Sequence, residues 1–300
     1  MLPNLIIAGV NKGGTTALFR HLASHPDISP STVKETCYFL PIRYGGTPGP
    51  LSEYEEYFKN YRNEKLVIES TPGYFYGGIK LANRIKSTLP NVRIVIVLRD
   101  PTSRFFSFFH FMKSMQKLNV STSASAYLEK CLKITPQEFS DPLNNTYFGL
   151  QGGYYADYLE EWLQVFGDKL YIDFFENLTL DPVRFMSSVS LFAGVDPSPF
   201  DGLKFKKENV TRAHYNESLH SFALYFYRNF SHKINANKSL KSFLMSTYNR
   251  INGAPISKNS DEEDFLRQII ASEYQSSNQR LKDQLLTFEG SVGLLPSWVG

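Results

Sequence analysis

Cysteine is scarce in this chain: Cys37 and Cys131 are the only two in 300 residues. Two are too few for a disulfide framework or for a zinc site built on cysteine, so the sequence predicts free thiols in a reducing compartment, with a single disulfide as the alternative. Long apolar runs are also lacking, because no stretch reaches the roughly eighteen residues that a membrane-spanning helix needs. We therefore expect a soluble, cytoplasmic protein that inserts into no membrane.

A concentrated positive charge is missing as well. The formal net charge is only +3, and there is no basic stripe of the kind that marks a nucleic-acid-binding domain. Nucleic acid is therefore not an expected partner. Apolar and aromatic residues, in contrast, are plentiful at 42% and 15% of the chain. That content is enough to bury one large core, and it leaves rings that could stack on a base or on a ring-bearing acceptor.

The first half of the chain alternates short apolar strands with helical stretches. Strands are expected over residues 5–10, 66–70, 92–98 and 170–175. Helices are expected over about 15–24, 81–88, 103–118, 154–166, 182–194 and 261–286. Such alternation predicts an α/β fold, a P-loop-like three-layer arrangement with a central, mainly parallel sheet flanked by helices. We expect a single domain over residues 1–300, with 44–58 and about 115–150 as surface excursions.

A glycine-rich loop follows the first strand. It runs from Gly9 to Thr16, reads GVNKGGTT and opens the next helix. Glycines allow the backbone to approach a ligand closely, and the N–H groups at a helix N-terminus converge on a phosphate. Thr15 and Thr16 add hydroxyl donors. The loop therefore predicts a phosphate-binding site that includes Lys12, Gly13 and Gly14.

The loop is not a Walker A motif. Gly9 and Gly14 have the spacing of that motif, but Thr15 stands where the motif has lysine, and Lys12 comes earlier in the turn. A magnesium-dependent clamp on a γ-phosphate is therefore disfavoured, and no metal is expected. A single 5′-phosphate, with Lys12 beside its bridging oxygen, suits the loop better.

A second basic element follows the strand expected over 92–98. Arg99 ends that strand, and Ser107 lies two turns into the next helix. Ligands of open α/β sheets bind at the carboxyl ends of the strands, so Arg99 and Ser107 are expected to hold one anion in the same crevice as the glycine loop. Arg104 lies between them, and it either joins them or pairs with an acid such as Asp100.

Together the two elements resemble the sulfotransferase family. The 5′-phosphosulfate loop of that family, K-x-G-T-T after a strand, is similar to the segment from Lys12 to Thr16, although Gly13 stands where serine or threonine is usual. The 3′-phosphate motif R-[ND]-P-x-x-R-x-x-S matches Arg99 through Ser107 at every named position. Further matches resemble the branch with heparan sulfotransferases and many bacterial relatives. They are His25-Pro26, Lys34-Glu35, the segment from Glu69 to Phe75, and Gly153-Tyr154 with Leu159 and Trp162.

The resemblance implies an enzyme that transfers a sulfuryl group from 3′-phosphoadenosine 5′-phosphosulfate (PAPS) to an acceptor hydroxyl or amine by in-line displacement, leaving 3′-phosphoadenosine 5′-phosphate (PAP). Lys12 and the Thr15–Thr16 end of the helix would hold the 5′-phosphate, and Arg99 with Ser107 the 3′-phosphate. The resemblance places the general base at Glu35. His21, His25 and His110 compete for that role, and His110 lies on the helix after the 3′-phosphate motif.

The acceptor side departs from the heparan branch. Cys37 and Leu40 replace the histidine and the acid of K-E-x-H-F-F-D, and Ser70 replaces a lysine that helps to hold an acidic sugar chain. Fewer fixed charges favour a small-molecule, carrier-tethered or neutral glycan acceptor. The late basic loop of the family has no clean match. Its candidates are Lys206, Lys207 and Arg212, within a stretch of about 205–260 that either forms an acceptor-side lid or packs as helix.

Two other functions compete with this interpretation. A P-loop nucleotide kinase or NTPase would need the missing Walker lysine, and it would have no use for the element from Arg99 to Ser107. A non-catalytic nucleotide-binding scaffold on the same fold is opposed by the joint presence of Lys12, Glu35, Arg99 and Ser107.

Overall fold

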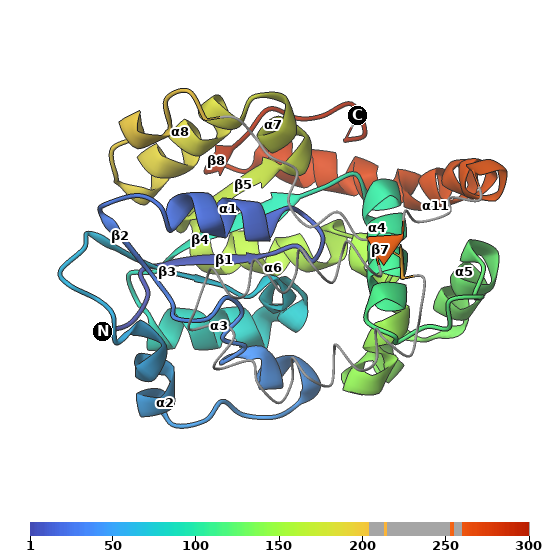
Figure 1. The fold of residues 1–300 in the computed structure, drawn as a ribbon, viewed down its shortest axis with the longest axis horizontal. Coiled ribbons are helices and arrows are strands. Elements are labelled where there is room, and N and C mark those ends of the chain that lie inside the picture. The colour runs from blue at the N-terminus through green and yellow to red at the C-terminus, as the bar shows by residue number, and fades with distance from the viewer. Residues whose placement is uncertain (204–212, 215–252, 255–259, 300) are drawn as a thin grey trace.

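A six-stranded parallel sheet forms the centre of the protein, which is described here by a computed structural model covering residues 1–203, 213–214, 253–254 and 260–299 (Figure 1). In spatial order its strands are β2 (Ile28–Pro30), β3 (Leu66–Ser70), β1 (Leu5–Gly9), β4 (Arg93–Leu98), β5 (Leu170–Phe174) and β8 (Ser291–Val292). All five neighbouring pairs in this sheet are parallel. The carboxyl ends of β1 and β4 are therefore adjacent, and this places the loops after them side by side.

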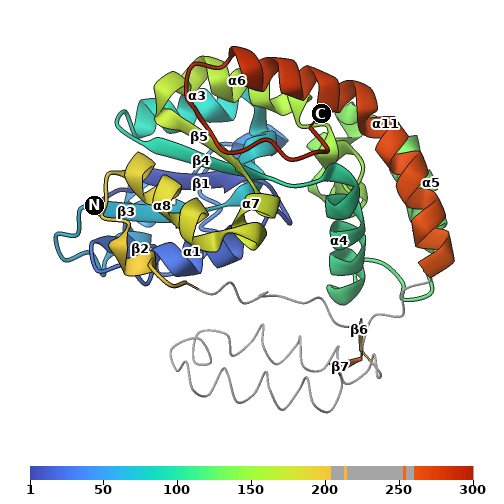
Figure 2. The same ribbon diagram turned by 90° about the horizontal axis from the view of Figure 1, so that it is seen from above.

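Helices cover both faces of the sheet, as Figure 2 shows from above. One face carries α1 (Thr15–Leu22), α7 (Phe175–Leu180) and α8 (Pro182–Ala193), and the other α3 (Gly78–Thr88), α6 (Ala156–Phe166) and α11 (Ser260–Thr287). Successive strand residues point to opposite faces, so Ile6 and Ile94 enter the core under α3 and α6, whereas Leu5 and Val95 enter the core under α1 and α8. The predicted three-layer α/β fold is confirmed.

Helix α4 (Pro101–Ser114) stands apart from these layers, beyond the strand ends, with α5 (Ala124–Lys133) and one end of α11 behind it (Figure 2). The prediction of 103–118 for α4 was wrong at both ends. Asp100 caps the helix, accepting a hydrogen bond from the Ser103 N–H at 2.6 Å, and Pro101 occupies the first turn, where no N–H is needed. The helix stops at Ser114, and Gln116 has a left-handed φ of 55°.

Residues 44–58, expected to be a surface excursion, are mostly exposed but also contribute to the core. This stretch contains α2 (Leu51–Glu55), and its Tyr54 is fully buried in the core with Phe58 only 2% exposed. The stretch of 115–150 also contributes buried side chains, because Tyr127 of α5 packs against α4. Tyr54 reaches the carboxyl end of β3, where its hydroxyl donates to Glu69. These buried contacts join segments that are far apart in the chain, so local sequence does not predict them.

No helix within the described ranges is both long enough and apolar enough to cross a bilayer. The stretch proposed as a lid, about 205–260, lies almost entirely outside the described residues, as do Lys206, Lys207 and Arg212.

Candidate active site

The glycine loop after β1 has the backbone of an anion cradle. Lys12 has a left-handed φ of 71°, which is uncommon outside glycine and marks a strained functional turn. Gly14 follows with φ 84° and begins α1 without a side-chain cap. The first N–H groups of α1, from Thr15 and Thr16, therefore have no intrahelical or capping acceptor and are available to an anion.

The structure explains why Gly13 stands where the family pattern usually has serine or threonine. A Cβ atom at this position would lie 2.4 Å from the carbonyl oxygen of Val97 in β4. Since that oxygen belongs to the backbone of a central strand, it cannot move aside. The loop is therefore pressed against β4 too closely for the usual serine or threonine.

We expect Gly13→Ser, although it restores the usual residue, to lower the free energy of unfolding by about 1–3 kcal/mol through overpacking. Because the loop must shift away from β4, binding of PAP, the ligand that the family resemblance implies, should weaken in the same variant. Urea denaturation and calorimetry with PAP measure the two effects. Wild-type stability together with wild-type affinity would show that the loop is not confined by β4.

Lys12 extends from the loop toward α4. Its Nζ lies 4.3 Å from the centroid of the Phe111 ring. Burial, followed by the nearby charge of Arg99, lowers the pKa of Lys12 to about 8, and the carboxylate of Glu35 opposes that shift. The lysine therefore lies in an electropositive environment in which an anion would restore its full charge.

Arg99 joins the two predicted anion sites. Its Nη1 donates a hydrogen bond to the backbone carbonyl of Lys12 at 3.0 Å, and its guanidinium lies 4.7 Å from the centroid of the Phe175 ring. The carbonyl of Arg99 accepts a hydrogen bond from the Tyr155 hydroxyl at 2.7 Å, which fixes the backbone at the end of β4. The loop after β1 and the arginine after β4 are thus in direct contact.

Ser107 lies on the side of α4 that faces the glycine loop. It is one turn after Ser103 and one turn before Phe111, and residues four apart share one side of a helix. Since Phe111 contacts Lys12, this face is directed at the loop. Ser103 and Ser107 are both partly exposed. Ser107 is therefore on the face of α4 that contacts Lys12, the residue whose carbonyl accepts the hydrogen bond from Arg99.

Arg104 does not pair with Asp100. That alternative was wrong, because Asp100 caps α4 instead. Arg104 is fully buried and donates through Nη2 to the carbonyls of Phe148, at 3.4 Å, and Gly149. Its hydrogen bonds fix the turn before α6, while its charge contributes to the lowered pKa of Lys12.

Glu35 lies in the segment between β2 and β3 that reads Lys34–Phe39, which we call the Glu35 loop. Its side chain is 50% exposed and accepts an ion-paired hydrogen bond from Lys34 Nζ at 2.7 Å. Glu35 has a left-handed φ of 67°, and its N–H donates to the Ser70 carbonyl at 2.9 Å. The carboxylate is close enough to Lys12 to affect the pKa of that residue. The site therefore contains a candidate base beside the 5′-phosphate loop.

The histidines take other positions. His25 is buried in the turn after α1, where its Nε2 lies 2.8 Å from the Asp196 carbonyl and its Nδ1 accepts the Asp27 N–H at 3.0 Å. The ring of His25 therefore has a structural role. His110 contacts α11, with Nε2 3.2 Å from Oε1 of Glu263.

Glu69 received no role in the sequence analysis beyond its place in a family match, and it is fully buried at the carboxyl end of β3. Its carboxylate accepts hydrogen bonds from four hydroxyl groups, which belong to Thr36, Tyr54, Thr71 and Tyr74. The sequence feature that could have indicated this network is the single acid within the apolar strand Leu66–Ser70, because a buried carboxylate needs hydrogen-bonding partners.

A comparison with protein families shows to which family the chain belongs. The family described as "Sulfotransferase domain" matches residues 2–245, which include the glycine loop, the Glu35 loop and the element from Arg99 to Ser107. The chain belongs to the sulfotransferase family. Members of this family use a sulfuryl donor, so the kinase interpretation is not favoured.

Similar curated sulfotransferases act on heparan sulfate, according to their names. The bifunctional heparan sulfate N-deacetylase/N-sulfotransferase 1 of Caenorhabditis briggsae is 29% identical over 67% of this chain and 23% of its own length. The heparan sulfate glucosamine 3-O-sulfotransferase 3B1 of Mus musculus is 28% identical over 65% of this chain and 46% of its own length. The chain thus spans less than half of either relative.

A solved sulfotransferase from Alicyclobacillus acidocaldarius has a similar fold. It aligns with a TM-score of 0.60 and 25% identity, covering 69% of this chain and 88% of its own.

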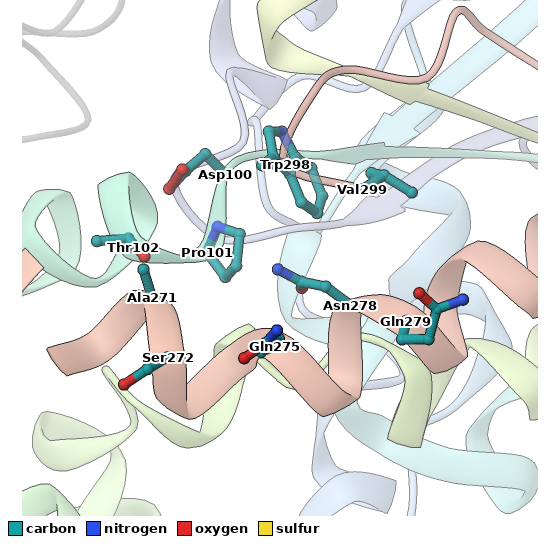
Figure 3. A pocket seen from close by; sticks show the side chains of 10 residues that line it. All are labelled: Asp100, Pro101, Thr102, Ala271, Ser272, Gln275, Asn278, Gln279, Trp298 and Val299. Atoms are coloured by element: carbon teal, nitrogen blue, oxygen red, sulfur yellow. The ribbon is translucent and has the colours of Figure 1, made fainter. Parts of the chain in front are cut away.

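The acceptor side of this sulfotransferase differs from the heparan branch at Ser70. The side chain of Ser70 is fully buried, so it offers no group at the surface where the branch has a lysine. The pocket in Figure 3, of about 480 Å³, lies elsewhere, between the start of α4, α11 and the C-terminal segment with Trp298. Its lining includes Asp100 but neither Lys12 nor Glu35. It is therefore separate from the site at the strand ends.

Proposed function

We propose that this sulfotransferase takes its sulfuryl group from PAPS and transfers it to an acceptor hydroxyl, an amine being the less favoured acceptor. The observation that carries this proposal is the hydrogen bond from Arg99 to the carbonyl of Lys12, which unites two anion-binding elements in one site. Two such elements suit a nucleotide with phosphates on both its 3′ and 5′ positions. The closeness of Gly13 to β4 also supports a cradle in which backbone N–H groups approach the ligand.

PAPS, when bound, supplies an activated sulfuryl group on its 5′-phosphate. Lys12 and the N–H groups of Thr15 and Thr16 would hold that phosphate and stabilise the charge that develops on its bridging oxygen as the S–O bond breaks. Glu35 would accept the proton of the acceptor oxygen as that oxygen bonds to sulfur. Alignment and charge stabilisation are the main demands of such a transfer, and both are met by fixed groups.

Arg99 and Ser107 would select the 3′-phosphate. Calorimetry should show binding of PAP without magnesium and much weaker binding of ATP with magnesium. Arg99→Gln should weaken PAP about 10- to 100-fold, since a hydrogen bond to a charged group contributes about 1.5–3 kcal/mol. Ser107→Ala leaves the Arg99–Lys12 contact in place. It should weaken the binding of PAP by a smaller factor than Arg99→Gln does, and it should leave the binding of ADP unchanged. Equal affinity for PAP and ADP would refute a 3′-phosphate site.

For the acceptor, we propose a small molecule, a carrier-tethered chain or a glycan with few negative charges. The relatives named above carry heparan sulfate in their names, but the chain spans less than half of each. The buried Ser70 supports a less charged acceptor. Incubation with PAPS and a panel of these three classes, read by mass spectrometry for the gain of one SO₃ group, tests the proposal. Transfer to heparan alone would overturn it.

A further inference from the structure

Glu69 is a carboxylate satisfied by hydroxyl groups. Oε1 accepts from Thr36 at 2.6 Å, from Thr71 at 2.7 Å and from Tyr74 at 2.9 Å, and Oε2 accepts from Tyr54. Among the described residues, no lysine, arginine or histidine forms an ion pair with it. Burial raises the pKa of Glu69 above its ordinary value, and the four hydroxyl donors oppose that shift. Such a group is costly in a core, so the hydrogen bonds around it are tightly constrained.

The hydroxyl groups that bind Glu69 also bind the backbone of the Glu35 loop. Thr71 Oγ1 accepts the N–H of Cys37 at 3.2 Å, and the Tyr74 hydroxyl accepts the N–H of Phe39 at 3.2 Å. Thr36, itself a member of the loop, donates directly to Glu69. The loop is thus held at Thr36, Cys37 and Phe39 by Glu69 and by two of the hydroxyl groups that donate to it.

The attachment is needed because the loop has a strained course. Glu35 and Cys37 both have left-handed φ values, 67° and 57°, a conformation that non-glycine residues rarely adopt. A backbone in this region persists only where surrounding contacts determine it. Between these two residues lies Thr36, which is 8% exposed and is held by Glu69. The direction in which the Glu35 side chain leaves the loop therefore depends on Glu69.

We propose that Glu69 is a positioning residue that holds the Glu35 loop so that the Glu35 carboxylate faces the acceptor beside Lys12. This inference rests on the proposed function, in which Glu35 is the general base. Glu69 acts only through Glu35, because it is fully buried and touches neither substrate.

Glu69→Gln tests the role with almost no change of volume. We expect kcat to fall about 100-fold, the loss typical of a displacement of about 1 Å at a reacting group. The KM for PAPS and the affinity for PAP stay within about twofold, because the anion-binding groups are on other elements. Asp173→Asn is the matched control: Asp173 is also buried, accepts from the Tyr171 hydroxyl at 2.6 Å, and lies on β5 away from the loop. It should lower the Tm and leave kcat near wild type.

A double-mutant cycle separates a positioning role from a general structural one. If Glu69 acts through Glu35, Glu69→Gln has almost no further effect on kcat in a Glu35→Gln background. The same reduction in both backgrounds would overturn the inference. A Glu35→Gln variant with wild-type turnover would instead refute the assignment of the base, whatever Glu69→Gln does.

Should Glu69→Gln fail to fold, Thr71→Val carries the same test. It removes one hydrogen bond to Glu69 and the one that holds the Cys37 N–H, and it keeps the shape of the side chain. A kcat loss that disappears in the Glu35→Gln background supports the inference, and an unchanged kcat in the folded Thr71→Val variant contradicts it.

Discussion

Glu35→Gln should reduce turnover by about 10²–10⁴-fold, the usual contribution of one well-placed general base. The variant keeps the size and shape of the side chain and loses its ability to accept a proton. Folding should change little, because the side chain is half exposed and surface ion pairs such as Lys34–Glu35 contribute about 1 kcal/mol or less. Single-turnover kinetics with saturating PAPS, together with PAP calorimetry, separates the loss of chemistry from any loss of binding.

Glu129→Gln is a matched control for that experiment. Glu129 is likewise an exposed glutamate paired with a lysine, Lys133, but it lies on α5. We expect wild-type turnover from it. If Glu35→Gln also turns over like the wild type, the base is elsewhere, and His110 would be the next residue to test.

Lys12→Met should lower kcat by about 10²–10³-fold, the loss typical of removing one donor to a developing negative charge. The pH dependence of the wild type provides a second measurement. Burial and Arg99 lower the pKa of Lys12 to about 8, so the lysine is charged below that pH and neutral above it. Stabilisation of the departing phosphate by Lys12 is therefore lost as pH rises, and kcat/KM for PAPS should decline above about pH 8.

The control for this pH profile is Lys12→Arg. An arginine stays charged across the accessible range, so the decline above about pH 8 should disappear even if the rate itself is lower. The profile of kcat should turn down at a higher pH than that of kcat/KM, because bound phosphate favours the charged lysine. If both variants keep the wild-type profile, Lys12 is not the group that titrates.

The layers of the fold and the meeting of the two proposed anion-binding elements could be predicted from local sequence. Leu5–Gly9 is apolar throughout and Arg93–Leu98 is apolar after its first residue, and the motifs that follow these strands must meet because parallel strands share one carboxyl edge. The contact between Arg99 and Lys12 is the direct outcome of that rule. Helix α8 could be predicted equally well, because Asp181 and Gly194 mark its two ends.

What could not be predicted depends on contacts between distant segments. The hydrogen bonds of Glu69 join β3 to Tyr54 of α2 and to Thr36, and no periodicity in the sequence predicts them. Arg104 was a plausible partner for Asp100 until the cap of α4 was seen to occupy that acid. Gly13 looked like a departure from the family, and only the position of the Val97 carbonyl explains it.

The grouping of Lys12, Arg99 and Arg104 has a practical consequence for work with this protein. These cations are close enough to lower the pKa of Lys12 together, and within the described residues Arg104 has no carboxylate partner. Small oxyanions relieve the mutual repulsion of these cations, so phosphate or sulfate in a buffer should compete with the nucleotide that we propose as the donor. Affinities measured in such buffers will be too weak, and they should recover in chloride-based solutions of low ionic strength.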